Sequence, residues 1–79
     1  FEDAELEAAF NADLIARTRA LREARGWTQS KMATYLGIPL DRYKKYESRS
    51  PLPQYLIPRF ADFVGRDIEY VLTGQEPRR

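Results

Sequence analysis

The stretch that most limits how this chain can fold is Thr28–Glu47, where two apolar patterns are separated by a glycine. Apolar residues share one helical face up to Leu36, Gly37 interrupts the pattern, and a second apolar face runs from Ile38 to Tyr46. Residues three and four apart lie on the same side of a helix, so this spacing favours helices over strands. The stretch therefore predicts two short helices joined by a tight turn.

Capping residues set the bounds of these two helices. Thr28 is a good N-cap residue and precedes an expected helix over 29–36, which Gly37 ends. A second helix is expected over 40–46, although Pro39 before it brings no hydroxyl or carboxylate to cap it. Two helices joined in this way form a helix-turn-helix, whose second helix is offered to the major groove of DNA.

A longer helix is expected before this pair. Asn11 is a suitable N-cap, Phe10 and Ile15 occupy hydrophobic-staple positions, and the helix should run to Arg25. Residues 1–10 either extend this helix or form a separate acidic turn.

The inward face of this first helix is expected to consist of three residues spaced by three or four. These are Leu14, Thr18 and Leu21.

Two further helices are expected after a loop. The prolines make 48–53 a loop, because they restrict their neighbours and remove backbone donors. Pro58 must lie in the first turn of a helix, which therefore begins one or two residues earlier and runs to Val64. Asp67 caps a last short helix over 68–72. The sequence thus predicts an all-α fold of five short helices.

Length and composition restrict the class of protein. The 79 residues form one domain, which we divide into an acidic N-terminal arm or helix extension (1–10), a helix-turn-helix domain (11–74) and a tail (75–79). There is no cysteine or histidine, so disulfides, thiolate ligands and imidazole catalysts are unavailable. No apolar run approaches the roughly 20 residues of a membrane span. We therefore expect a cytoplasmic protein that is not an enzyme, with no cofactor, metal, membrane or small-molecule substrate.

The charge distribution is more informative than the net charge of +1. Residues 1–13 carry five acidic and no basic residues, whereas the remainder carries 13 basic and 7 acidic residues. A basic body with an acidic N-terminal arm suits contact between the body and phosphate. The alternative is an ordinary solvated surface.

Several segments match a known family in order and with the expected loop lengths. They are Leu-Arg-Glu-Ala-Arg-Gly-Trp-Thr-Gln over 21–29, Met-Ala-x-x-Leu-Gly-Ile over 32–38, Tyr-Glu at 46–47, and Phe-Ala-x-x-Val-Gly-x-x-Ile-x-x-Val-Leu-x-Gly over 60–74. From Leu14 to Gly74 the chain resembles the DNA-binding domain of phage repressors and Cro, the lambda-repressor-like helix-turn-helix family. This resemblance implies a compact five-helix domain that binds specific double-stranded DNA. It also implies a homodimeric regulator of bacterial or phage origin, either a repressor or an antitoxin, that is nucleoid-associated when bound.

The resemblance also implies site residues. Positions expected to face bases are Leu40, Asp41, Arg42 and Lys45. Positions expected to contact the DNA backbone are Thr28, Gln29, Lys44, Arg49 and Ser50. The strongest base-reading candidate is Arg42, because a guanidinium fits the O6 and N7 acceptors of guanine.

A structural ion pair is implied between Arg22 and Glu47, which would tie the first helix to the end of the third. Tyr43 and Tyr46 are expected in the core, since both fall on the inward face of 40–46. For the homodimer, Ile68 and Tyr70 are a candidate contact patch, although core packing explains Ile68 equally well.

The start of the expected recognition helix departs from the family pattern. Pro39, Leu40 and Asp41 stand where many relatives have Ser, Thr or Gln, and Arg49 stands where Gly is usual. Leucine can contact only a thymine methyl or a sugar, and a carboxylate repels phosphate although it can accept from cytosine N4. The alternative function is therefore a protein-interaction module that keeps the fold without reading DNA.

Overall fold

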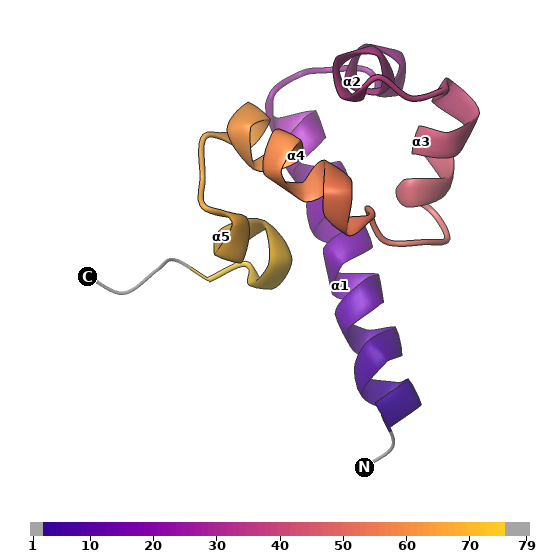
Figure 1. The fold of residues 1–79 in the computed structure, drawn as a ribbon, viewed down its shortest axis with the longest axis vertical. Helices are drawn as coiled ribbons and strands as arrows, with labels where there is room; N and C mark the ends of the chain where they lie inside the picture. Colours follow the sequence, from indigo (N-terminus) through magenta and orange to yellow (C-terminus); the bar gives the residue numbers. More distant parts are fainter. Residues whose placement is uncertain (1–2, 76–79) are drawn as a thin grey trace.

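The computed structural model describes residues 3–75, and within this range it contains α-helices and one turn of 3-10 helix but no strand (Figure 1). The elements, in order, are α1 (Asp3–Ala24), α2 (Gln29–Leu36), α3 (Leu40–Tyr46), η1 (Gln54–Leu56), α4 (Ile57–Val64) and α5 (Ile68–Thr73). The expected all-α fold of five α-helices is confirmed. None of the helices in this range is long and apolar enough to cross a membrane.

The first helix begins earlier than the local capping signal predicted. α1 starts at Asp3 and passes through Asn11 without interruption, so the assignment of Asn11 as the N-cap was wrong. Residues 4–9 are all Ala, Leu or Glu, which are strong helix formers, and acidic residues stabilise the first turn of a helix. One asparagine inside a helix costs well under about 1 kcal/mol. Figure 1 shows the resulting N-terminal half of α1 extending away from the rest of the molecule.

The two helices of the central motif have the predicted bounds. The Thr28 hydroxyl accepts a hydrogen bond from the backbone amide of Lys31 at 3.1 Å and thereby caps α2. Gly37 has a φ of 75°, in the left-handed region that side chains with a Cβ rarely adopt, and it turns the chain toward α3. Pro39 occupies the N-cap position of α3 and makes no side-chain capping bond.

The core lies where these helices meet α1, α4 and α5. Its largest fully buried side chains are Tyr43, Phe60, Met32, Val71 and Thr18. In α1 the buried residues are Leu14, Thr18 and Arg22, whereas Leu21 is half-buried and packs against the core. All three residues of the predicted inward face therefore contact the core, Leu21 less deeply than Leu14 and Thr18, and Arg22 is buried beside them.

The C-terminal helices complete the core, and α4 contacts α2 directly through the hydrogen bonds between Tyr35 and Arg59. Pro58 lies in the first turn of α4, as predicted, and Gly65 ends that helix with a φ of 77°. α5 extends one residue beyond the predicted span, and Asp67 occupies its N-cap position without a side-chain capping bond. The Arg17 guanidinium on α1 donates to the carbonyl oxygens of Val71 (2.8 Å) and Leu72 (2.7 Å). These two hydrogen bonds fix the C-terminal end of α5 to α1.

Candidate nucleic-acid interface

The inward side of the helix-turn-helix is organised around one buried carboxylate, that of Glu47. Arg22 donates to it through Nε (2.7 Å) and Nη2 (3.1 Å), in the paired geometry that suits a guanidinium and a carboxylate. The two residues are only 8% and 6% exposed. The ion pair that the resemblance implied is therefore present, and it joins α1 to the residue that follows α3.

Two further side chains donate to the same carboxylate. The Tyr43 hydroxyl donates to Oε2 of Glu47, and Gln29 Nε2 donates to Oε1 at 3.1 Å. Gln29 is the first residue of α2, so the carboxylate connects the beginning of α2 to the end of α3. The angle between these helices is thus held by hydrogen bonds as well as by apolar packing.

The hydrogen bonds decide the protonation state of this network. Burial is the largest single influence on the Glu47 pKa and raises it, but the hydrogen bonds from Arg22, Tyr43 and Gln29, together with the positive charge of Arg22, outweigh burial and hold the pKa below its ordinary value. Burial, and then the bond to Glu47, raises the pKa of Tyr43 so far that the phenol remains a donor. The bond to Glu47 likewise raises the pKa of Arg22. The network is therefore an ionised glutamate surrounded by donors.

The outward side of α3 presents charged side chains to solvent. Asp41, Arg42, Lys44 and Lys45 are all exposed. Within residues 3–75 none of these four side chains makes a hydrogen bond or ion pair. The short helix is consequently amphipathic, with its buried side fixed to the core and its other side available to a partner.

The loop that follows α3 contains a further exposed basic residue, Arg49. The amide nitrogens of Ser48, Arg49 and Ser50 all donate to the carbonyl of Lys45, at 3.2, 2.8 and 3.0 Å, so the loop turns tightly against the helix end. The Arg49 side chain is exposed and, among the described residues, without an intramolecular bond, whereas Ser50 is half-buried. The structure thus brings the basic residues of the motif together along 42–49.

The other basic side chains in residues 3–75 behave differently, because each one contacts a group of the protein. Arg17 and Arg22 are bonded as described above. The remainder bind a carboxylate, a carbonyl or an aromatic ring: Arg19 to Glu23, Arg25 to Val64 and Phe63, Lys31 to Trp27, Arg59 to Tyr35, and Arg66 to Tyr70. Among the described residues, the basic side chains without an intramolecular partner therefore all lie on α3 and the loop that follows it.

Three predicted contact residues also have roles inside the domain. Leu40 is half-buried and packs against the core, so its apolar character at the start of α3 has a structural explanation. The hydroxyl of Thr28 is used in capping α2, and the amide of Gln29 is used in bracing Glu47. These three side chains therefore already have contacts inside the domain, unlike the exposed cations of α3 and the loop after it.

The tyrosines of α3 lie as predicted, with Tyr43 fully buried and Tyr46 half-buried against the core. The bond from Tyr43 to Glu47 was not predicted. Its signal was available, because residues four apart face each other on a helix and a buried phenol needs a partner.

Comparison with known families gives one result. A family model described as "Helix-turn-helix" matches residues 19–71, which include α2, α3, α4 and the network around Glu47. Domains of this family are associated with DNA binding and transcriptional regulation. The family is typical of regulators that are not enzymes. Comparisons with curated proteins and with solved structures find no match to this chain.

Proposed function

Because this chain belongs to the helix-turn-helix family of the Cro/C1 type, we propose that it binds specific double-stranded DNA sequences as a transcriptional regulator, with α3 in the major groove. One observation supports this assignment most strongly. Arg42, Lys44, Lys45 and Arg49 are the described cations without an intramolecular partner, and they lie on α3 and the loop after it. Phosphate contact requires free cations of this kind on the side that meets the duplex.

The proposed roles follow from position on the helix. Arg42 lies in the first turn of α3, where a recognition helix meets base edges, and its guanidinium can bind guanine O6 and N7. Lys45 and Asp41 flank it on the exposed side, and Asp41 can accept from cytosine N4. Lys44, Arg49 and Ser50 would contact the backbone and fix the register.

The finer role is also a proposal. We assign the domain to a repressor or to an antitoxin that regulates its own operon in a bacterial or phage-infected cell. Two copies would bind paired half-sites one helical turn apart, which is the usual arrangement for a helix-turn-helix.

The second candidate function is a protein-interaction module that has kept the fold. Its motive is the start of α3, where Pro39 brings no side-chain cap and Leu40 is partly withdrawn into the core. The two candidates differ in salt dependence, because phosphate contacts release counterions and protein contacts of ordinary polarity do not.

The deciding experiment is selection of binding sites from a random duplex DNA library at about 50 and 200 mM salt. We expect one enriched motif, weaker recovery at the higher salt, and loss of the motif in Arg42→Ala. A two-fold-symmetric motif supports the homodimer, and a single asymmetric half-site contradicts it. Arg19→Ala is the matched control, because Arg19 is an exposed arginine of α1 whose partner is Glu23. No enrichment at either salt concentration overturns the DNA-binding proposal.

A further inference from the structure

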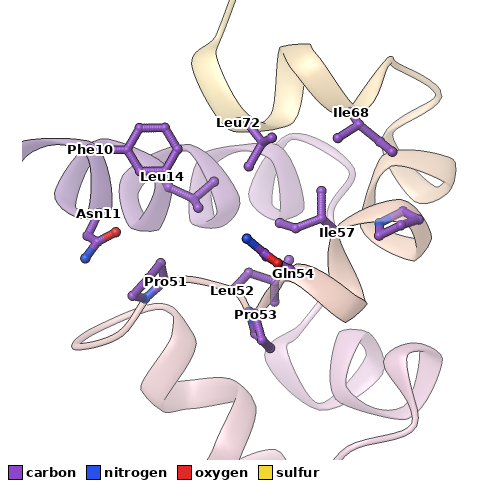
Figure 2. Close-up of a pocket in the computed structure, with 11 residues that line it drawn as sticks. Phe10, Asn11, Leu14, Pro51, Leu52, Pro53, Gln54, Ile57, Ile68 and Leu72 are labelled. Atoms are coloured by element: carbon purple, nitrogen blue, oxygen red, sulfur yellow. The ribbon is translucent and has the colours of Figure 1, made fainter. Parts of the chain in front are cut away.

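An apolar cavity of about 510 Å³ lies between α1, α5 and the segment that leads into η1 (Figure 2). Its apolar lining includes Phe10, Leu14, Pro51, Leu52, Ile68 and Leu72. Phe10 and Ile68 are 45% and 44% exposed, so the cavity opens to solvent beside them. Ligand-binding cavities are commonly about 300–1,000 Å³, so this space can receive several side chains of an occupant.

The apolar surface extends beyond the cavity along α1. Leu6 is 48% exposed and lies one turn before Phe10 on the same helix. An elongated apolar strip that continues past a cavity suits an extended or helical protein segment better than a compact small molecule. We use the name α1–α5 groove for the cavity together with Leu6.

Two acidic side chains continue the same side of α1. Asp3, Glu7 and Asn11 are spaced by four residues, and Asn11 lines the cavity. With a rise of 1.5 Å per residue, Glu7 and Asp3 lie roughly 6 and 12 Å beyond Asn11 along the helix axis. Both carboxylates are exposed, and within residues 3–75 neither makes a hydrogen bond or ion pair.

No basic side chain of α1 neutralises these acids. Arg17 is the first basic residue on the helix, and its guanidinium is already bonded to Asp13 and to the carbonyls at the end of α5. The groove is therefore apolar at one end and has two free negative charges at the other.

From this arrangement we propose that the α1–α5 groove binds a segment of another protein that places apolar side chains in the cavity and Lys or Arg residues against Glu7 and Asp3. A helical segment would carry its two basic residues four positions apart, to match the spacing of the acids. Figure 1 places α2 and α3 at one end of the molecule and the N-terminal half of α1 at the other, so the acidic end of the groove lies away from the proposed DNA-binding helix.

A second copy of this chain matches the groove poorly. The large apolar side chains exposed in residues 3–75 are Leu6, Phe10, Tyr55 and Ile68, and all but Tyr55 belong to the groove itself. Facing two grooves together would bring the Asp3 and Glu7 carboxylates of both copies to one interface, which like-charge repulsion disfavours.

The test is selection of a displayed library of random 16-residue peptides against the complete chain, followed by affinity measurements on the enriched peptides. We expect peptides that combine apolar residues with Lys or Arg and whose affinity falls with salt. Phe10→Lys and Ile68→Lys should each weaken binding at least tenfold, whereas Tyr55→Lys, at an exposed ring outside the groove, should not. The double variant Asp3→Asn/Glu7→Gln should weaken binding several-fold at low salt, and Glu5→Gln/Asp62→Asn, which removes two acids outside the groove, should not.

Binding to the unmodified chain gives a second readout that does not depend on how variants fold. Amide chemical shifts should change near residues 6–14, 52–57 and 68–72 on peptide addition and stay unchanged over 42–45. Enriched peptides without basic residues, or equal binding by both charge variants, overturn the proposal. So does a chain whose sedimentation shows a dimer that Phe10→Lys dissociates, because a second copy then covers the groove. Arg42→Ala should lose DNA and retain the peptide, which separates this proposal from the DNA-binding one.

Discussion

Arg22 and Arg42 are the same residue type, and their surroundings give them opposite uses. Arg22 is 8% exposed and donates to Glu47 through two nitrogens, whereas Arg42 is exposed and, among the described residues, has no partner. The α3 segment separates these two environments, since its inner side carries Tyr43 and its outer side carries the free cations. A charge whose donors are satisfied inside the domain stabilises the fold, and a charge left unsatisfied outside is available for recognition.

The largest effect should come from removing the buried carboxylate. Glu47→Ala removes the buried partner of Arg22, which keeps only the Trp27 carbonyl and the exposed Glu23 carboxylate at 3.8 Å, and it deprives Tyr43 of its acceptor. We therefore expect a loss of about 3–5 kcal/mol in the free energy of unfolding. That is a large fraction of the stability of a domain this small. Urea denaturation followed by circular dichroism at pH 7 measures it. The triple variant Arg22→Met/Tyr43→Phe/Glu47→Leu replaces the network by apolar groups and should be more stable than Glu47→Ala. A loss below about 1 kcal/mol for Glu47→Ala would show that the network is not critical.

Acid should weaken the same network without a mutation. The pKa of Glu47 is lower in the folded protein than in the unfolded chain, so its ionised form stabilises the fold above the unfolded value of about 4.3 and this contribution is lost as the pH falls through the folded pKa. We expect the wild type to lose more stability than the apolar triple variant between pH 5 and pH 3 in parallel urea titrations. Equal losses would assign the acid sensitivity to other carboxylates.

On the outer side, Arg42→Ala should affect binding and leave folding intact. Loss of a paired contact to guanine costs about 1–3 kcal/mol and relaxes the preference at that base pair. Competition binding with the selected duplex and its single-base variants checks this, and the unfolding midpoint should change by no more than that of an ordinary surface variant. An unchanged base preference would remove Arg42 from the site.

Single backbone contacts should give the smallest effects. Lys44→Gln and Arg49→Gln should each weaken binding to all sequences alike and lower the slope of log K against log salt by about 0.9. Binding titrations at four salt concentrations measure the slope, with Arg66→Gln as the control because the guanidinium of Arg66 stacks on Tyr70. If Arg66→Gln lowers the slope as much as Lys44→Gln and Arg49→Gln do, the exposed cations of α3 and its loop are not the surface that contacts DNA.

Helix bounds were predicted best from the sequence where a single residue fixes the local backbone conformation. Thr28 and Gly37 bound α2 correctly, because a capping hydroxyl and a left-handed glycine are local features. At Asn11 two local tendencies competed, and the continuous run of helix-forming residues before it prevailed over the capping signal.

Features that depend on tertiary contact were harder to predict. The burial of Arg22 follows from its pairing with a glutamate 25 residues away, which the resemblance implied but the periodicity of α1 alone does not contain. The α1–α5 groove was not predicted, because its lining comes from segments that meet only in the fold. The recognition residues were named by resemblance, and the structure adds which of them have no intramolecular partner.

The bond between Arg17 and the end of α5 also determines the order in which parts of this domain can open. A six-residue helix is far below the roughly 12–15 residues that hold together alone in water, so α5 exists because α1 supports it. Amide protons of α5 are therefore expected to exchange with solvent as one cooperative unit, at a rate set by release of the Arg17 guanidinium and withdrawal of Val71 from the core. Each such event opens the groove wall that Ile68 and Leu72 provide, while α2 and α3 keep the geometry that Glu47 gives them.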